Sequence, residues 1–166
     1  MKTYLNLVAF IIVLFGGITF LDSCKKESSE TSEINEENES HETKISHYNG
    51  TESHNMGQAC MNCHKQGGSG EGVFNVAATI YDSTMINVFP NATVKLYTGA
   101  NGSGTLKYTI EVDAKGNFYT TENIDFTNGL YPAVTGTQGT RYMSSSITTG
   151  NCVSCHGNST GKIWTK

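Results

Sequence analysis

Four of the five cysteines in this 166-residue chain fall into two copies of one five-residue pattern, C-x-x-C-H. The first copy is C-M-N-C-H at residues 60–64, and the second is C-V-S-C-H at residues 152–156. We refer to them as the first and the second motif. Gly, Ser, Asn and Thr dominate the segments around both motifs, and such segments form loops and not helices. The fold must therefore hold two chemically identical turns that lie near opposite ends of its body.

The spacing within each motif is the attachment signature of c-type haem. Two thiols three positions apart can reach the two vinyl groups on one edge of a porphyrin and form thioethers, while the following imidazole lies under the iron. The sequence therefore predicts two covalent haem c groups. The predicted thioether cysteines are Cys60, Cys63, Cys152 and Cys155, and the predicted proximal iron ligands are His64 and His156.

Three other uses of these cysteines stay open. All four could form disulfides in an oxidising compartment, although a bridge between cysteines three apart is strained and redox-active. The two pairs could instead hold one zinc ion, although the gap from Cys63 to Cys152 is far longer than in ordinary zinc modules. A thioredoxin-type redox pair is the third alternative, but such a pair precedes a helix in a βαβ unit that this sequence lacks.

The sixth ligand of each iron has several candidates among the remaining histidines and methionines. They are His41, His47, His54, Met56, Met61, Met85 and Met143. Residues 53–59 and 150–157 resemble the segments around the two motifs of small bacterial envelope c-type cytochromes, in which a Met also lies upstream of the second motif. This resemblance implies His54 and Met143 as the two distal ligands. A thioether ligand raises the potential of the iron relative to a second imidazole, so the two haems would differ in potential.

The N-terminus has the layout of an export signal, with Lys2 followed by an apolar run over residues 5–20. This run is shorter than the ~20 residues that a spanning helix needs. The ending L-D-S-C resembles a bacterial lipobox, so we predict a signal peptide at residues 1–23 and lipid attachment at Cys24. An uncleaved anchor helix is the alternative. Either one would tether the chain to a membrane of the bacterial cell envelope, with the outer membrane as the expected location.

Residues 24–53 are rich in Glu, Ser, Asn and Thr and nearly lack large apolar side chains. Such a segment cannot bury enough surface to fold, so we predict a disordered acidic tether. The formal net charge of the chain is -4, and this segment carries most of the acidic excess. The remaining body is nearly neutral, which gives no indication of nucleic-acid binding.

Short runs of β-branched and aromatic residues, separated by Gly, Asn and Asp, indicate antiparallel strands between residues 73 and 134. The expected strands are 73–81, 92–97, 106–112 and 117–121. Residues 91–97 and 113–119 resemble carboxypeptidase regulatory-like domains, which are β-sandwiches. The sequence thus predicts a mainly β fold, in which a small antiparallel β-sandwich is flanked by two loop-built haem sites within one domain at residues 54–166.

Together these features predict an extracytoplasmic electron carrier and not an enzyme. Loops of small polar residues offer little to cover a haem, so shallow haems are expected, which suits exchange with redox partner proteins in the envelope. A β-sandwich that binds a polysaccharide or a partner protein, with accessory or sensory haems, is one alternative. A haem peroxidase, which would need an open position on one iron, is another.

Overall fold

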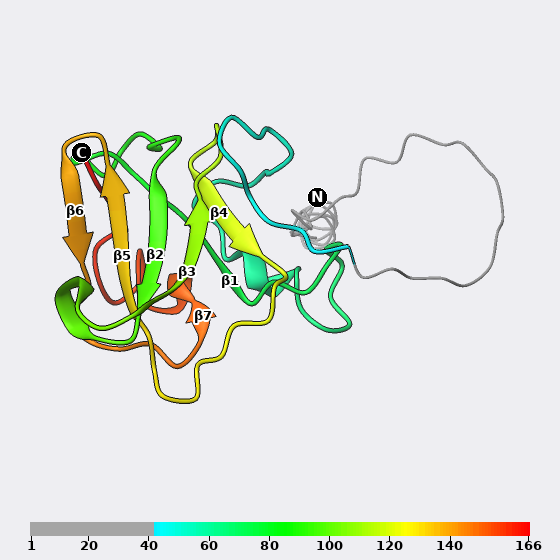
Figure 1. Cartoon of the computed structure of the whole chain (residues 1–166). Coiled ribbons are helices and arrows are strands. Elements are labelled where there is room, and N and C mark those ends of the chain that lie inside the picture. Colours follow the sequence, from blue (N-terminus) through cyan, green and yellow to red (C-terminus); the bar gives the residue numbers. More distant parts are fainter. Residues whose placement is uncertain (1–41) are drawn as a thin grey trace, which may run out of the picture.

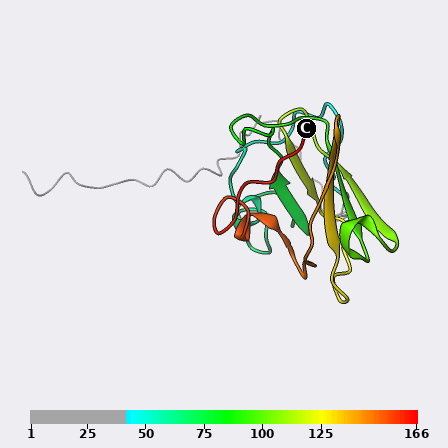
Figure 2. The same cartoon turned by 90° about the vertical axis from the view of Figure 1, so that its left-hand side faces the viewer.

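The computed structural model describes residues 42–166, which form two β-sheets packed against each other (Figure 1). Figure 2 shows the two sheets as separate layers. The predicted mainly β fold and small β-sandwich are confirmed. The predicted signal peptide, Cys24 and most of the predicted tether lie outside the described residues. Within the described residues, no helix is long and apolar enough to cross a membrane.

The larger sheet has four strands in the order β3-β2-β5-β6, and all neighbouring strands are antiparallel. Its strands are β2 (Thr93–Tyr97), β3 (Leu106–Glu111), β5 (Tyr131–Gly136) and β6 (Gly139–Tyr142). Val94 on β2 lies opposite Ile110 on β3 and opposite Val134 on β5. Directly opposed residues share one face of a sheet, so these three buried side chains form an apolar row across its centre.

The smaller sheet has three strands in the order β4-β1-β7. These are β1 (Val76–Thr79), β4 (Asn117–Thr120) and β7 (Gly150–Asn151). β4 pairs antiparallel with β1, whereas β7 pairs parallel with β1 and places Gly150 opposite Val76. The smaller sheet is therefore mixed. This parallel pairing brings the segment of the second motif next to the first strand of the fold.

The core lies between the two sheets and takes its side chains from both. The smaller sheet and the residue after β1 contribute Val76, Ala78, Ile80 and Phe118, and the larger sheet contributes Val94, Leu96, Ile110 and Val134. Phe118 is the largest side chain among those that are almost completely buried. Val153, Ile147 and Ile163 are partly buried and pack against this core, so the segment around the second motif forms part of it.

The four expected strands exist, with bounds that are shorter than expected at one or both ends. Strands β5, β6 and β7 lie outside the expected set, and each has a physical reason for its weak sequence signal. β5 contains Pro132, which cannot donate a backbone hydrogen bond and so argues against a central strand. β6 is mostly exposed, and β7 has only two residues, so neither shows a buried alternation.

The predicted tether extends too far, because residues 44–53 pack on the sandwich. Ile45 forms an isolated bridge with Thr120, and the hydroxyl of Ser46 donates to the carbonyl of Glu111 at 2.5 Å. Ser46 and Ser53 are both buried. Backbone hydrogen bonds to β4 and its flanks stabilise this polar segment although its large apolar side chains, Ile45 and Tyr48, stay exposed, which composition alone cannot reveal. The body therefore begins near Lys44, and not at residue 54.

Candidate functional site

The two motifs adopt the same local backbone turn. The first motif begins with the 3-10 helix η1 (Cys60–Asn62), and the second begins with η3 (Cys152–Ser154). The backbone N–H of His64 donates to the carbonyl of Cys60 at 2.9 Å, and that of His156 donates to the carbonyl of Cys152 at 3.0 Å. Since the flanking sequences differ, the common turn follows from the motif itself.

Each motif histidine has one ring nitrogen fixed by a backbone carbonyl. Nδ1 of His64 lies 2.9 Å from the carbonyl oxygen of Glu71, and Nδ1 of His156 lies 2.8 Å from that of Gly161. A carbonyl can only accept, so Nδ1 carries a proton, and in a neutral imidazole of this tautomer Nε2 presents a lone pair. Histidines that bind metals are oriented in this way by a second hydrogen bond. Both imidazoles are thus set up to ligate through Nε2.

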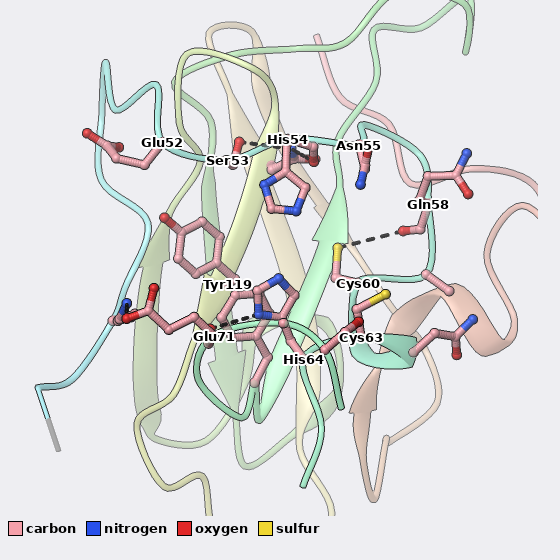
Figure 3. Close-up of a pocket in the computed structure, with 17 residues that line it drawn as sticks. Glu52, Ser53, His54, Asn55, Gln58, Cys60, Cys63, His64, Glu71 and Tyr119 are labelled. Atoms are coloured by element: carbon pink, nitrogen blue, oxygen red, sulfur yellow. Dashed lines mark hydrogen bonds and ion pairs between the residues drawn. The ribbon is translucent and has the colours of Figure 1, made fainter. Parts of the chain in front are cut away.

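A first pocket of about 610 Å³ contains the first motif and His54. Figure 3 shows the rings of His54 and His64 facing each other across it, with a ring nitrogen of His64 directed toward His54. Their ring centroids are 5.9 Å apart. Two metal–nitrogen bonds of about 2.0 Å, plus the distance from each nitrogen to its ring centre, give a separation of roughly 6 Å. The spacing therefore suits two imidazoles on one iron.

Aromatic packing holds the ring of His64 from the other side. Phe74 stacks on His64 with a centroid distance of 4.0 Å and an interplanar angle of 4°, and Tyr119 stacks on Phe74 at 4.8 Å. Gly70 completes this enclosure, because a Cβ at this position would lie 2.8 Å from atoms of the His64 ring. The imidazole is therefore oriented by packing as well as by its hydrogen bond.

The backbone of His54 is held by the buried side chain of Asn117 on β4. Its amide nitrogen donates to the hydroxyl of Ser53 at 2.9 Å and to the carbonyl of His54 at 3.2 Å. Its amide oxygen accepts from the hydroxyl of Thr79 on β1 at 2.5 Å. The ammonium of Lys115 donates to the carbonyl of Ser53 at 2.6 Å. Two strands of the smaller sheet thus determine where His54 lies.

A second pocket of about 580 Å³ contains the second motif and Met143. It opens between the sheets, because its walls include inner-face residues of both. Both pockets fall within the range of roughly 300–1,000 Å³ that is usual for cofactor sites. Among the described distal-ligand candidates, only His54 and Met143 line a pocket that also holds a motif, whereas His41 lies outside the described residues.

Basic side chains line both pockets. Lys44 lines the first pocket and forms an ion pair of 2.7 Å with Glu71. Arg141 lines the second pocket, with its guanidinium 3.4 Å from the centre of the Trp164 ring, and Lys162 lines the same pocket. Cationic side chains of this kind match the propionate groups of a haem. Trp164 itself also lines the second pocket, so its ring forms part of the pocket wall.

The electrostatics of the cysteines do not resemble those of a redox-active pair. Burial raises the pKa of Cys60, and burial, with smaller effects of neighbouring cysteines, raises the pKa of Cys152 to about 12. Thioredoxin-type cysteines have lowered pKa values. Within residues 42–166, no three His, Cys, Asp or Glu side chains converge on a common metal position, so no observation favours the zinc alternative.

The state of the thiols differs among the four motif cysteines. Cys60, Cys152 and Cys155 are free thiols, whereas Cys63 is disulfide-bonded in this structure. A disulfide and a haem thioether at the same sulfur exclude each other. The chemical state of Cys63 is therefore one of the measurements that test a haem at the first motif.

Several residues of these sites carried no sequence signal. Asn117, Phe74 and Gly70 orient the two histidines of the first pocket, and the carbonyls of Glu71 and Gly161 fix the proximal rings. Carbonyl contacts depend on backbone geometry and not on residue type, so composition could not have found them. Neither family models, nor curated proteins, nor solved structures match this chain.

Proposed function

We propose that this protein is an electron carrier of the cell envelope with two covalently attached c-type haems. One observation carries the proposal: each motif histidine has Nδ1 tied to a carbonyl and shares a pocket with a second candidate ligand. With a signal peptide at residues 1–23 and lipid attachment at Cys24, both proposed here as well, the carrier would be anchored to the outer membrane and would meet redox partner proteins there.

In the proposed carrier, the chain binds and orients both groups. Cys60 and Cys63 attach the first haem and Cys152 and Cys155 the second, and His64 and His156 are the proximal ligands, with His54 and Met143 as the distal ones. A bound haem supplies reversible one-electron exchange at its iron. Arg141 and Lys162 would neutralise propionates of the second haem, whereas Lys44 at the first pocket is paired with Glu71. Because a candidate sixth ligand lies in each pocket, the geometry favours a carrier over a peroxidase, which needs an open position.

The haem content tests this proposal. We expect the chain, exported together with haem-attachment machinery, to contain two haems that acid-acetone does not extract. The Cys60→Ala/Cys63→Ala and Cys152→Ala/Cys155→Ala variants should each retain one, because each motif attaches its haem independently. Pyridine-haemochrome spectra give the number of haems, and peptide mass spectrometry identifies the attached cysteines.

A matched control uses the same export route with Ser145→Ala, a change in the wall of the second pocket that leaves both motifs intact. This variant should keep both haems. Failure to attach haem, with Cys63 still in a disulfide or with zinc bound instead, would overturn the electron-carrier proposal and leave a β-sandwich of another function.

The Asn117→Ala substitution is expected to release His54 from the first iron. It removes both hydrogen bonds that hold Ser53 and His54, and it leaves buried polar groups unsatisfied at a cost of about 1–3 kcal/mol. Electron paramagnetic resonance should show a new high-spin ferric signal in place of one low-spin signal. The control is Asn75→Ala, which removes a hydrogen bond of 3.1 Å from the side-chain amide of Asn75 to the carbonyl of Thr121, next to the same sheet. In this variant the spectrum should stay unchanged. A low-spin first site in Asn117→Ala would contradict this role.

A further inference from the structure

The outer face of the larger sheet carries a stripe of tyrosines. Successive residues of a strand alternate between faces, and directly opposed residues share one face. Because Val94 on β2 points into the core, Tyr97, three residues further on, points away from it. Tyr131 on β5 pairs with Tyr97, and Tyr142 on β6 pairs with Ala133, two residues further along β5. Three tyrosines therefore cross β2, β5 and β6 on the side that faces away from the smaller sheet (Figure 2).

The rings of this tyrosine stripe are accessible. Tyr142 is 47% exposed, and Tyr97 and Tyr131 are partly exposed. Their three hydroxyls form no hydrogen bond within residues 42–166. Polar residues normally cover the face of an antiparallel sheet that meets water. A tyrosine on a strand instead offers a flat apolar ring and a polar tip, at a low cost in conformational entropy. The stripe is thus a surface that can stack on a flat ligand.

Hydroxyl groups and one cation surround the stripe. Thr93, Thr135 and Thr140 pair with one another in a row across β2, β5 and β6 on the same face. Lys95 lies between this row and the stripe, and it forms no ion pair within the described part of the chain. Leu106, at the edge on β3, is the only large aliphatic side chain among the paired residues of this face. The face therefore combines aromatic rings with hydrogen-bonding groups and an unpaired positive charge.

We propose that this face binds a polysaccharide whose sugars carry carboxylates. A sugar ring presents C–H groups on its flat side, which pack on tyrosine rings, and hydroxyls at its rim, which exchange hydrogen bonds with the hydroxyls of this face. Directly opposed residues lie about 5 Å apart and diagonal neighbours about 7–8 Å apart, a spacing close to that of successive sugars in a chain. The ammonium of Lys95 would pair with a sugar carboxylate.

The charge of this face argues against a protein as its occupant. A second copy of the chain that docked here about a two-fold axis would bring two unpaired Lys95 side chains together, and like charges across an interface are unfavourable. The centres of interfaces with other proteins are depleted of lysine. A carboxylated polysaccharide supplies the opposite charge and matches the hydroxyls as well.

The test measures binding of the full chain, purified in detergent, to polygalacturonate by isothermal titration calorimetry. Its methyl ester has the same sugar rings without the charge and should bind more weakly. Tyr131→Thr removes a ring that borders neither pocket and keeps a strand-forming residue, so binding should weaken about tenfold. Tyr131→Phe keeps the ring and should retain most of the affinity. Lys95→Gln should weaken binding about fivefold and reduce its dependence on salt.

Lys65→Gln is the matched control, at an exposed lysine in the loop after the first motif, and should bind as the unchanged chain does. Circular dichroism shows whether each variant folds, and Tyr97→Thr replaces Tyr131→Thr if that variant does not. A folded chain that binds neither polygalacturonate nor alginate would overturn the site. Equal affinity for polygalacturonate and its methyl ester, or a dimer that Lys95→Gln strengthens, would overturn the recognition of carboxylates. Haem content enters none of these measurements, so this site and the proposed carrier function can fail separately.

Discussion

The Cys152→Ala/Cys155→Ala variant is expected to lose far more stability than the Cys60→Ala/Cys63→Ala variant. The second pocket opens between the sheets, where a haem would pack against Ile147 and Ile163, two partly buried side chains at the edge of the core. Losing it would uncover these side chains, with an expected loss on the order of 2–3 kcal/mol in the free energy of unfolding. The first pocket lies on the outer face of the smaller sheet, so its loss should cost about 1 kcal/mol or less.

Urea unfolding followed by far-ultraviolet circular dichroism measures this difference. The two double variants serve as controls for each other, because each removes two cysteines and one proposed haem. Losses of equal size would show that the second haem does not complete the core, and would place it on the surface like the first.

The Gly150→Ala substitution is expected to separate β7 from β1 and to disrupt the second motif. A Cβ at this position would lie 2.6 Å from Cα of Val76 and closer still to the carbonyl oxygen of Asn75. Both atoms belong to the backbone, so neither can move aside by a change of rotamer. We expect a loss of about 3 kcal/mol in the free energy of unfolding, at the upper end for overpacking, and incomplete haem attachment at the second motif.

Gly161→Ala is the matched control, because its Cβ would lie 3.7 Å from the sulfur of Met85, an ordinary contact near the same motif. Thermal unfolding and the haem content of the C-terminal peptide measure both variants. Wild-type haem content at the second motif in Gly150→Ala would mean that this motif does not depend on the pairing of β7 with β1.

The larger sheet was predictable where the sequence alternates and unpredictable where the fold depends on remote partners. In β2, Val94 and Leu96 alternate with partly exposed neighbours, which is the burial pattern the structure has. β7 pairs with a strand that lies more than seventy residues earlier in the chain, and its two residues carry no signal of their own. The position of residues 44–53 likewise depends on hydrogen bonds to β4, which polar composition concealed.

The candidate sites divide in the same way. The motif turns were predictable because their hydrogen bonds join residues within five positions, such as that between Cys60 and His64. The hydrogen bond that holds His54 was not predictable, because the donor, Asn117, lies 63 positions from the His54 carbonyl in the sequence. Sequence patterns report local geometry, whereas the position of each proposed distal ligand depends on tertiary contacts.

The attachment of residues 44–53 to the sandwich limits how far the body could reach from a membrane. If Cys24 carries the proposed lipid, only twenty residues separate it from Lys44, and a fully extended chain of that length spans at most about 70 Å. A tether that ended at Ser53 would have allowed a distance of about 100 Å between Cys24 and the body. Since Lys44 also lines the first pocket, this pocket lies where the tether joins the body. In the proposed carrier, the tether would therefore join the body beside the first haem site and not beside the second.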